Sequence, residues 1–456
     1  MVMGAGPTPV PGILTTVTIA RMLEPPRYAL IGAGSRSATY LDALVGKYRQ
    51  FAKLVGLCDP SPTRLAWHNQ RLANEHQCPP VPTYSPNDFD RMIRERKPNA
   101  VIVTVPDYLH HDYIIRAMQA GCDVICEKPL TIDGAKLRAI FDAMNRTGRK
   151  LQVTLNARYM PEMMAVRRVI LEGRIGTPMA ADLSWVLDTS HGADFFRRWH
   201  REKDKSGGLL VHKASHHFDL VNWFLGSYPS RVFAMGDLKF YGREAAAGRG
   251  ESYSYDRYTG APQAANDPFA IRLDQDEQTR NLYLDAERDS GYVRDRNVFG
   301  SGITIEDTIA LTARYRSGVI LSYSLIAFSP WEGLRLSISG TKGRVELYAR
   351  YGAHVLTGSD AERREASQTI RRLTVFPMFG LPQKTDIGED KGGHGGADPA
   401  ILNDLFSPDP GADLLGARST VWDAAASVLV GIAANESIAS GRPVDCDEIL
   451  RIPDAH

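Results

Sequence analysis

A short polar stretch, GGLLVHKASHHFD at residues 207–219, gathers three of the twelve histidines in the chain. His212, His216 and Asp219 are spaced i, i+4 and i+7, so a regular helix would carry all three on one face. Such a face could take a proton from a substrate, because imidazole changes its charge near neutral pH. Alternatively, the two histidines have the spacing of a zinc site that Asp219 or His394 could complete. The choice between the two depends on what else the chain binds.

A glycine-rich turn near the N-terminus predicts a nucleotide site. In LIGAGSRS, at residues 30–37, Gly32, Gly34 and Ser37 take the positions of the pattern G-x-G-x-x-G/A. The first glycine permits a tight turn, the second lets the backbone approach a pyrophosphate, and the third position needs a small residue. The helix that begins there would offer free N–H groups to phosphate. The predicted phosphate-binding residues are Gly32, Gly34, Ser35, Arg36 and Ser37.

Asp59 indicates which dinucleotide is bound. It ends the next apolar strand, KLVGLCD at residues 53–59, and lies 25 residues after Gly34. A carboxylate at that strand end accepts hydrogen bonds from the ribose hydroxyls and repels a 2′-phosphate, which favours NAD over NADP. Arg64, within the first turns of the following helix, could moderate this preference or could belong to a solvated helix face.

Apolar strands alternate with helices through the first third of the chain. Continuous apolar runs are typical of strands covered on both faces, and the βαβα order favours a parallel, doubly wound sheet of the Rossmann kind. The predicted strands are residues 27–32, 53–59, 99–105, 122–127 and 150–155.

The pattern changes after about residue 155. A helix near 161–173 is followed by runs with period-two alternation and by turn signals such as GTKG, which are typical of an antiparallel sheet packed on one face. The last element, at 421–441, is a helix that ends at glycine.

These patterns divide the α/β chain into three parts. We predict an N-terminal extension at residues 1–25, a Rossmann NAD-binding domain at 26–155, and a C-terminal α+β domain at 156–456 with a large, open, mostly antiparallel sheet. Within the third part, residues 242–300 form an insert that is either partly helical around 273–288 or a long loop over a site.

The composition is that of an ordinary globular protein, with 456 residues of which 43% are hydrophobic and 23% charged. The net charge of +1 gives no sign of a nucleic acid or a membrane surface as a partner. The five cysteines are scattered without zinc-ribbon or redox-dithiol spacing, which favours free thiols in a reducing compartment. No apolar run reaches the length of a membrane span. We therefore expect a cytoplasmic protein.

The most specific stretch is VIVTVPDYLHHDYIIRAMQAGCDVICEKPLT at residues 101–131. It has a strand ending in Val105-Pro106, His110 opening the next helix, and the triplet Glu127-Lys128-Pro129 at the end of the following strand. In these features the chain resembles the glucose–fructose oxidoreductase / inositol dehydrogenase / MocA family. The resemblance covers nearly the whole chain except the extension and the insert, with further matches in NARY (156–159), EGRIGTP (172–178), ISGTKGRVEL (338–347) and GGHGGAD (392–398).

The resemblance implies a role for the EKP lysine, here Lys128. In such enzymes this lysine reaches the substrate hydroxyl beside the nicotinamide. An ammonium group in a partly desolvated cleft has a lowered pKa and can relay the proton that leaves with the hydride. The resemblance also implies cofactor contacts from neighbouring residues, namely Val105, Pro106, His110, Glu127 and Lys128 itself.

The polar stretch at 207–219 matches the family pattern G-G-x-L-x-D-x-G-x-H-x-x-D. The family histidine falls on His216, which the resemblance implies as a general base for the hydroxyl proton. The family aspartate falls on His212, so that a neutral imidazole replaces a carboxylate; His212 could share the base role, bind a substrate hydroxyl or help to bind an acidic substituent. Lys213 and His217 would point away from this face. Because a hydride acceptor lies in the same cleft, a metal is unnecessary, and we predict none.

Three further residues are predicted to contact the substrate. Arg158 follows the last strand of the nucleotide domain and could line the cleft or pack at the domain junction. Trp199, within HGADFFRRWHR at 191–201, suits a sugar face surrounded by polar groups, or belongs to a structured loop. Lys213 could recognise an acidic group on the substrate, although a solvated surface explains it equally well.

Together these features predict an NAD-dependent oxidoreductase that acts on a ring secondary alcohol of a sugar, a glycoside or a cyclic polyol. The alternative is a redox-neutral glycoside hydrolase, in which transient oxidation acidifies a C–H bond, the glycosidic bond is eliminated, water adds and the hydride returns. His212 and the tyrosines of the insert could supply the extra acid or base for that route. A non-catalytic sensor is a third possibility, against which Lys128 and His216 argue. The resemblance further implies a homodimer or a homotetramer.

Overall fold

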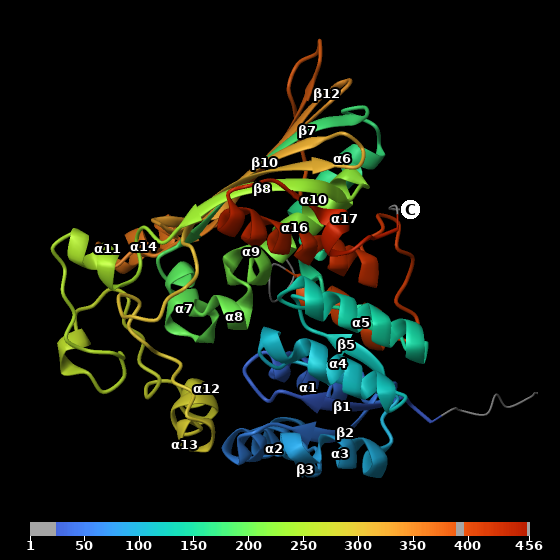
Figure 1. The fold of residues 1–456 in the computed structure, drawn as a ribbon, viewed down its shortest axis with the longest axis vertical. Coiled ribbons are helices and arrows are strands. Elements are labelled where there is room, and N and C mark those ends of the chain that lie inside the picture. Colours follow the sequence, from blue (N-terminus) through green and yellow to red (C-terminus); the bar gives the residue numbers. More distant parts are fainter. Residues whose placement is uncertain (1–23, 389–395, 454–456) are drawn as a thin grey trace, which may run out of the picture.

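The computed structural model describes residues 24–388 and 396–453. Nearly all of the predicted extension, and His394 of the alternative zinc set, lie outside these residues. Figure 1 shows the two sheets one above the other, with the N-terminal domain below and the C-terminal sheet above. One continuous cluster of buried apolar side chains runs from the N-terminal domain into the C-terminal sheet.

The N-terminal domain is a six-stranded parallel sheet in the order β3-β2-β1-β4-β5-β6. Its strands are β1 (Arg27–Ile31), β2 (Lys53–Cys58), β3 (Thr83–Tyr84), β4 (Ala100–Val103), β5 (Asp123–Cys126) and β6 (Leu151–Val153). The helices are α1 (Ser37–Val45), α2 (Pro62–His76), α3 (Phe89–Arg96), α4 (His110–Gln119) and α5 (Gly134–Thr147). Every residue of β4 is buried, as the continuous apolar runs predicted. The strand order is that of the doubly wound dinucleotide-binding fold, so the predicted fold is confirmed.

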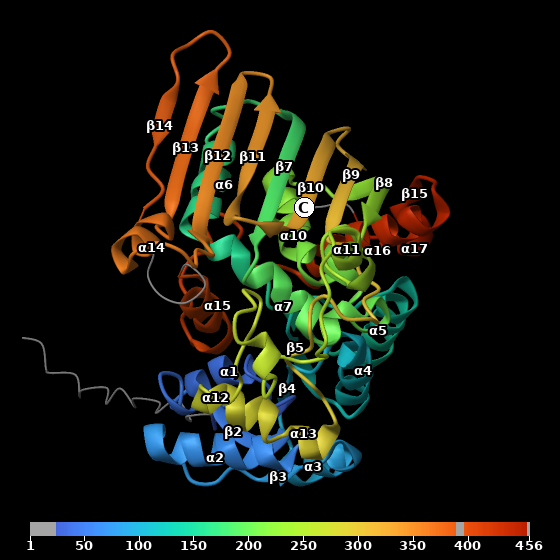
Figure 2. The same ribbon diagram turned by 90° about the vertical axis from the view of Figure 1, so that its left-hand side faces the viewer.

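The C-terminal sheet has nine strands in the order β14-β13-β12-β11-β7-β10-β9-β8-β15 (Figure 2). They are β7 (Pro178–Asp188), β8 (Pro229–Asp237), β9 (Thr308–Tyr315), β10 (Ile320–Ser329), β11 (Trp331–Gly340), β12 (Gly343–Ala353), β13 (Ile370–Pro377), β14 (Gln383–Thr385) and β15 (Val444–Asp445). Its neighbouring strands are antiparallel except for the central pair β7–β10, so the predicted sheet type is also confirmed.

Helices cover one face of this sheet. On β8, Val232 and Ala234 point into the covered face, whereas Phe233 and Met235 on the other face are 40% and 69% exposed. The predicted last helix is α16 (Val421–Ser440), which ends at Gly441 in the left-handed conformation. The other helices of this part are α6 (Pro161–Leu171), α7 (His191–Arg197), α8 (Lys203–Ser206), α9 (Gly208–His212), α10 (Ala214–Leu225), α14 (Asp360–Ala366), α15 (Ala397–Phe406) and α17 (Cys446–Ile449).

Two segments beyond residue 155 return to the N-terminal domain. Helix α15 packs the ring of Phe406 against Tyr28 and Tyr48, with ring centroids 5.3 and 5.8 Å apart. The second segment is the insert, whose far end lies beside α2 in both views (Figures 1 and 2). Its elements are α11 (Arg243–Gly248), a 3-10 helix (Pro262–Ala264), α12 (Glu277–Thr279), a short π-helix (Arg280–Leu284) and α13 (Glu287–Ser290). The helical prediction around 273–288 is therefore confirmed in short pieces. In the described part of the chain, no helix is long and apolar enough to cross a membrane.

Candidate active site

The glycine-rich turn between β1 and α1 has the geometry that the sequence predicted. Gly32 has a φ of +96°, and a Cβ atom there would lie 2.6 Å from the backbone of Thr104. At Gly34 a Cβ atom would meet nothing within 4 Å, so the backbone is open to a ligand on that side. Ser37 is buried and donates from Oγ to the carbonyl of Gly34 at 2.6 Å, which closes the turn. The turn therefore fits a dinucleotide phosphate.

Asp59 holds this turn from the end of β2. Its carboxylate accepts hydrogen bonds from the backbone N–H of Ala33 at 2.7 Å and of Ser61 at 2.8 Å. Burial raises the pKa of Asp59, and the nearby guanidinium of Arg64, 3.7 Å away, opposes that shift. Arg64 thus belongs to the site, whereas the sequence left a solvated helix face open.

Arg36 and Glu127 brace the phosphate loop. The Nε atom of Arg36 donates to Glu127 at 2.5 Å, and its other nitrogens donate to Asp398 of α15 at 2.9 and 3.1 Å. Tyr40 donates a second hydrogen bond to Glu127 at 2.7 Å. Burial disfavours the charge on Glu127, but the Arg36 guanidinium and the Tyr40 hydroxyl bring its pKa below the usual value. The side chains of Arg36 and Glu127 therefore position the loop and join the two domains; any cofactor contact of theirs remains a prediction.

His110 has a similar positioning role. It is buried, with Nδ1 at 2.7 Å from the carbonyl of Pro129 and Nε2 at 3.0 Å from the carbonyl of Val105. It thus ties the turn that follows β4, where Val105 and Pro106 lie half-buried, to the turn that carries Lys128. Direct contact of His110 with a cofactor does not follow from this arrangement.

Lys128, His212 and Asp107 meet at the carboxyl edge of the Rossmann sheet. The Nζ atom of Lys128 lies 3.4 Å from Nε2 of His212 and donates to the carbonyl of His212 at 3.3 Å. On the other side of the imidazole, Nδ1 of His212 lies 2.5 Å from a carboxylate oxygen of Asp107. The predicted lysine and histidine are thus brought together, with a carboxylate that the sequence analysis had not singled out.

Burial controls the charge state of this trio. It lowers the pKa of Lys128 to about 8, although the carboxylates of Asp107 and Glu127 act in the opposite direction. Burial raises the pKa of Asp107 well above the usual range of a carboxyl group. Burial also holds the pKa of His212 well below the usual value of an imidazole. Lys128 can therefore exchange a proton near neutral pH while the His212 ring stays neutral.

Aromatic rings enclose His212. The centroid of the His200 ring lies 4.1 Å from the centroid of the His212 ring, and those of Phe195 and Trp199 lie 5.6 and 5.9 Å from it. Trp199 stacks on His200 with ring centroids 3.8 Å apart. His216, one turn further along the chain, is half-buried, and its charge would help to keep His212 neutral. The structure therefore places the ring of Trp199 beside His212, and the substrate contacts of Trp199 and His216 remain predictions.

The polar stretch is not one regular helix. α9 ends at His212 and α10 begins at Ala214, with Lys213 between them. His217 is buried, stacks on Trp185 of β7 at 3.9 Å and bonds to Tyr323 at 2.8 Å, so it points away from the trio as predicted. Lys213 lies 5.7 Å above the Trp185 ring, and its charge also lowers the pKa of Lys128. Lys213 therefore lies near the trio. Its contact with the substrate stays a prediction.

Asp219 and Arg158 form a buried ion pair instead of lining the cleft. Two nitrogens of Arg158 donate to Asp219 at 2.9 and 2.6 Å, and Asp423 lies 3.3 Å from the same guanidinium. Arg158 is 2% exposed and Asp219 is fully buried. The packing alternative for Arg158 thus fits the structure, and its predicted substrate contact does not, because its charge is already matched by two carboxylates.

Comparison with known proteins assigns both domains to one family. The family model described as "Oxidoreductase family, NAD-binding Rossmann fold" matches residues 26–155, and that described as "Oxidoreductase family, C-terminal alpha/beta domain" matches residues 167–446. The chain belongs to the Gfo/Idh/MocA family of oxidoreductases. It is therefore an enzyme of the oxidoreductase class with NAD as its cofactor, as the sequence predicted.

One curated relative and several solved structures cover most of this Gfo/Idh/MocA chain. "Putative oxidoreductase YteT" of Bacillus subtilis is 33% identical over 92% of this chain and 98% of its own. An inositol 2-dehydrogenase of Rhizobium meliloti is 29% identical over 46% of this chain and 57% of its own. Among solved structures, the aldose-aldose oxidoreductase of Caulobacter crescentus covers 92% of this chain and 99% of its own, with a TM-score of 0.58 and 17% identity. The WlbA dehydrogenase of Bordetella pertussis, in complex with NADH and UDP-GlcNAcA, covers 92% and 98%, with a TM-score of 0.59 and 17% identity. At such identities the solved structures show the shared fold.

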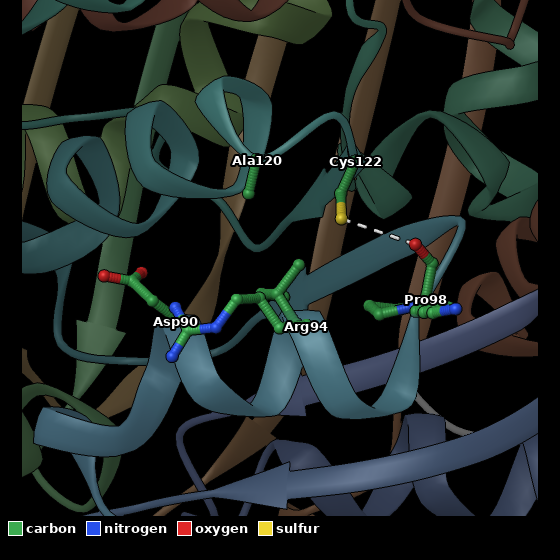
Figure 3. Close-up of a pocket in the computed structure, with 7 residues that line it drawn as sticks. Asp90, Arg94, Pro98, Ala120 and Cys122 are labelled. Atoms are coloured by element: carbon green, nitrogen blue, oxygen red, sulfur yellow. Dashed lines mark hydrogen bonds between the residues drawn. The ribbon is translucent and has the colours of Figure 1, made fainter.

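Two other features of this Gfo/Idh/MocA protein lie away from the trio. A hollow of about 460 Å³ is lined by Asp90, Arg94, Pro98 and Cys122 among others (Figure 3). Since Pro98 precedes β4 and Cys122 precedes β5, the hollow lies at the amino ends of the strands, opposite the edge where ligands of such sheets bind.

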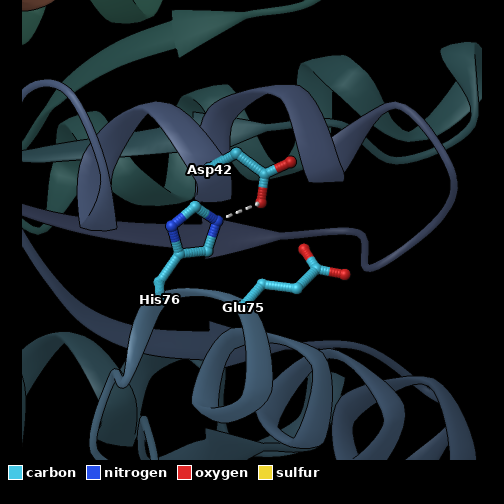
Figure 4. Close-up of side chains that lie close together, drawn as sticks. All are labelled: Asp42, Glu75 and His76. Carbon is cyan, nitrogen blue, oxygen red and sulfur yellow. Dashed lines mark ion pairs between the residues drawn. The ribbon is translucent and has the colours of Figure 1, made fainter.

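The second feature is a group of possible metal ligands. In the residues that the structure describes, Asp42, Glu75 and His76 form the one group of three spaced closely enough for an ion (Figure 4). Arg71 already pairs with Asp42 at 2.6 Å and with Glu75 at 2.8 Å, so the group is a surface ion-pair cluster. Asp219 is not available to the alternative zinc set because it pairs with Arg158, and His394 lies outside the described residues.

Sequence reasoning missed Asp107 and His200, and it left the insert open as a partly helical segment or a long loop over a site. A signal for Asp107 was present, because it directly follows Pro106 at the carboxyl end of a predicted strand, where site residues gather. His200 is one of two basic residues beside Trp199, and no spacing rule distinguishes it from its neighbours.

Proposed function

We propose that this protein oxidises a ring secondary alcohol of a sugar, a glycoside or a cyclic polyol. The observation that carries the proposal is the placement of Lys128 against His212, with Asp107 behind it, at the carboxyl edge of an NAD-binding sheet. The names of relatives support the substrate class, since they include two inositol 2-dehydrogenases and a levoglucosan dehydrogenase.

In the proposed reaction, NAD supplies the acceptor for the hydride that leaves the ring carbon. The hydroxyl proton passes to the neutral amine of Lys128, so the alcohol loses one hydride and one proton and becomes a ketone. The ammonium form of Lys128 is then stabilised by the Nε2 lone pair of His212, whose Nδ1–H donates to Asp107. In this proposal Trp199, whose ring lies beside the same imidazole, and His216 contact the substrate.

The redox-neutral glycoside hydrolase is the second candidate. His200 favours it, because its imidazole lies 4.1 Å from that of His212 and adds a proton-transfer group that plain alcohol oxidation does not need. Elimination of a glycosidic bond requires one group to take the acidified C–H proton and another to protonate the leaving oxygen. Lys128, His212 and His200 together offer enough groups for both tasks.

One assay separates the two candidates. Purified protein is mixed with free sugars, cyclitols and aryl glycosides, with and without added NAD, while reduced nicotinamide and released aglycone are followed together. Net formation of NADH from a free sugar or cyclitol supports the dehydrogenase. Release of aglycone without net NADH supports the hydrolase, and no reaction with any ring alcohol contradicts both. The Lys128→Ala protein is the blank.

We also infer that the chain forms a homodimer or a homotetramer in the cytoplasm. The uncovered face of the C-terminal sheet carries large apolar side chains, among them Met235 and Ile320 at 69% and 44% exposure. A Met235→Lys variant should therefore shift the mass measured by light scattering toward the monomer. Five free cysteines, four of them buried, suit a reducing compartment.

A further inference from the structure

The far end of the insert lies against the nucleotide half of the Rossmann domain. Residues 277–291 span α12, the π-helix and α13. We call them the clamp segment. Figures 1 and 2 both show it beside α2, far from the sheet strands between which the insert is connected. It is held there by a small apolar cluster of its own, in which Leu282 and Tyr283 pack with Trp67 of α2.

Tyr283 of the clamp segment lies at the phosphate loop. Its hydroxyl accepts a hydrogen bond from the backbone N–H of Ser35 at 3.2 Å, and Gln278 donates to the Ser35 hydroxyl at 3.4 Å. The guanidinium carbons of Arg64 and Arg294 lie 5.7 and 5.5 Å from the centroid of the Tyr283 ring. Backbone N–H groups of this loop are the ones that face a dinucleotide phosphate, so Tyr283 lies at the mouth of the phosphate site.

Asp289 of the clamp segment lies at the adenosine end. Its carboxylate accepts from the hydroxyl of Ser61 at 2.5 Å and from the backbone N–H of Thr63 at 3.2 Å. Arg64 donates to the carbonyl of Leu282 at 2.7 Å, and the exposed Arg288 lies 3.9 Å from Asp289 and donates to the hydroxyl of Thr63 at 3.2 Å. Ser61, Thr63 and Arg64 follow Asp59 closely in the chain. In a site that binds NADP, hydrogen-bond donors and positive charge for the 2′-phosphate lie at this place. The Ser61 hydroxyl and the Thr63 N–H are occupied by Asp289, which also adds a second negative charge beside Asp59.

We propose that the clamp segment is the outer wall of the adenosine and diphosphate half of the cofactor site. Tyr283 covers the phosphate loop, and Asp289 acts with Asp59 to reject a 2′-phosphate. NAD then enters and leaves only when the clamp segment separates from the loop, so the clamp segment slows the release of NAD. The proposal rests on the NAD-binding part of the proposed function and is independent of the substrate.

The first test measures the binding of NAD and of NADP by calorimetry, which needs no substrate. In Asp289→Asn, removal of a like charge should raise the affinity for NADP relative to NAD by about tenfold. Asp274→Asn is the matched control, because it makes the same change on an exposed residue of the same insert and should leave the ratio unchanged. An unchanged ratio in Asp289→Asn, with NAD still bound, overturns the role of Asp289.

The second test measures how fast bound NAD leaves when it is chased with excess ADP-ribose. Tyr283→Phe loses the hydroxyl that holds the clamp segment on Ser35, and NAD release should accelerate about tenfold, as expected for the loss of ~1.4 kcal/mol. Amide hydrogen exchange on the unaltered protein is the companion measurement, and adding NAD should slow exchange within residues 277–291. If Tyr283→Phe leaves the rate of NAD release unchanged and NAD does not slow exchange in this segment, the proposal that the segment covers the cofactor is wrong. This holds even where the protein still oxidises a polyol.

Discussion

The imidazole of His212 lies 2.5 Å from the carboxylate of Asp107, across the boundary between the two domains. The family pattern has an aspartate where this chain has His212. In this protein an imidazole stands between Lys128 and a carboxylate of the Rossmann domain. The Asp107 carboxylate raises the pKa of Lys128, although burial disfavours the carboxylate's own charge.

Replacing Asp107 by asparagine tests this relationship. Asp107→Asn should lower kcat by about tenfold, or ~1.4 kcal/mol, while NAD still binds. Because the Asp107 carboxylate raises the pKa of Lys128, its loss should also move the pH profile of oxidation toward acid. The control is Asp112→Asn, an exposed carboxylate on the helix that follows. A slower reaction with an unmoved pH profile would show that Asp107 acts only on the fold.

The pH dependence of the unaltered enzyme reports the amine of Lys128. Burial lowers its pKa to about 8, and the neutral amine is the form that takes the hydroxyl proton. The rate of alcohol oxidation should therefore rise through pH 8 and level off above it, whereas carbonyl reduction should fall over the same range. Initial rates between pH 6 and 10 check this. A midpoint near 6.5 would instead point to an imidazole as the titrating group.

Arg158 is predicted to matter for stability. Arg158→Ala leaves Asp219 buried without its partner, which should cost about 3–5 kcal/mol of unfolding free energy. The control is the exposed ion pair between Arg231 and Asp445. Arg231→Ala should cost about 0–1 kcal/mol of unfolding free energy. Urea unfolding measures both. A raised KM with unchanged stability in Arg158→Ala would restore the substrate contact that the sequence suggested.

Asp59 is predicted to set cofactor choice together with the loop geometry. Asp59→Asn keeps an oxygen that can accept from the Ala33 N–H but removes the charge. The affinity for NADP relative to NAD should therefore rise by about tenfold, with some loss of affinity for both. Binding titrations with each dinucleotide decide it. An unchanged preference would mean that Asp59 serves the turn alone.

Local patterns predicted much of the fold and part of the site. The alternation of apolar strands and helices gave the parallel sheet, and the turn at Gly32 and Gly34 has the predicted geometry, because both depend on residues close together in the chain. The place of Lys128 followed from a motif at a strand end. Pairings between distant residues were not predictable in this way.

The missed features all join segments that are far apart. Asp107 and His212 are separated by 105 positions, and Ser35 and Tyr283 by 248. Which distant partners meet depends on how two domains and an insert pack, and no spacing rule encodes that. The break at Lys213 was missed for a related reason, because the periodicity of the stretch fits one regular helix and the two short helices α9 and α10 equally well.

The most direct test of the account is a single-turnover measurement on Lys128→Ala with saturating NAD and the best ring alcohol found in the substrate panel. Formation of reduced nicotinamide would be followed by absorbance after rapid mixing, with the binding of NAD measured on the same sample. The account predicts that NAD binds as in the unaltered protein while the rate falls by about 10²–10⁴-fold, the usual contribution of a positioned proton acceptor. A rate close to that of the unaltered protein would contradict the assignment of Lys128 as the group that takes the hydroxyl proton.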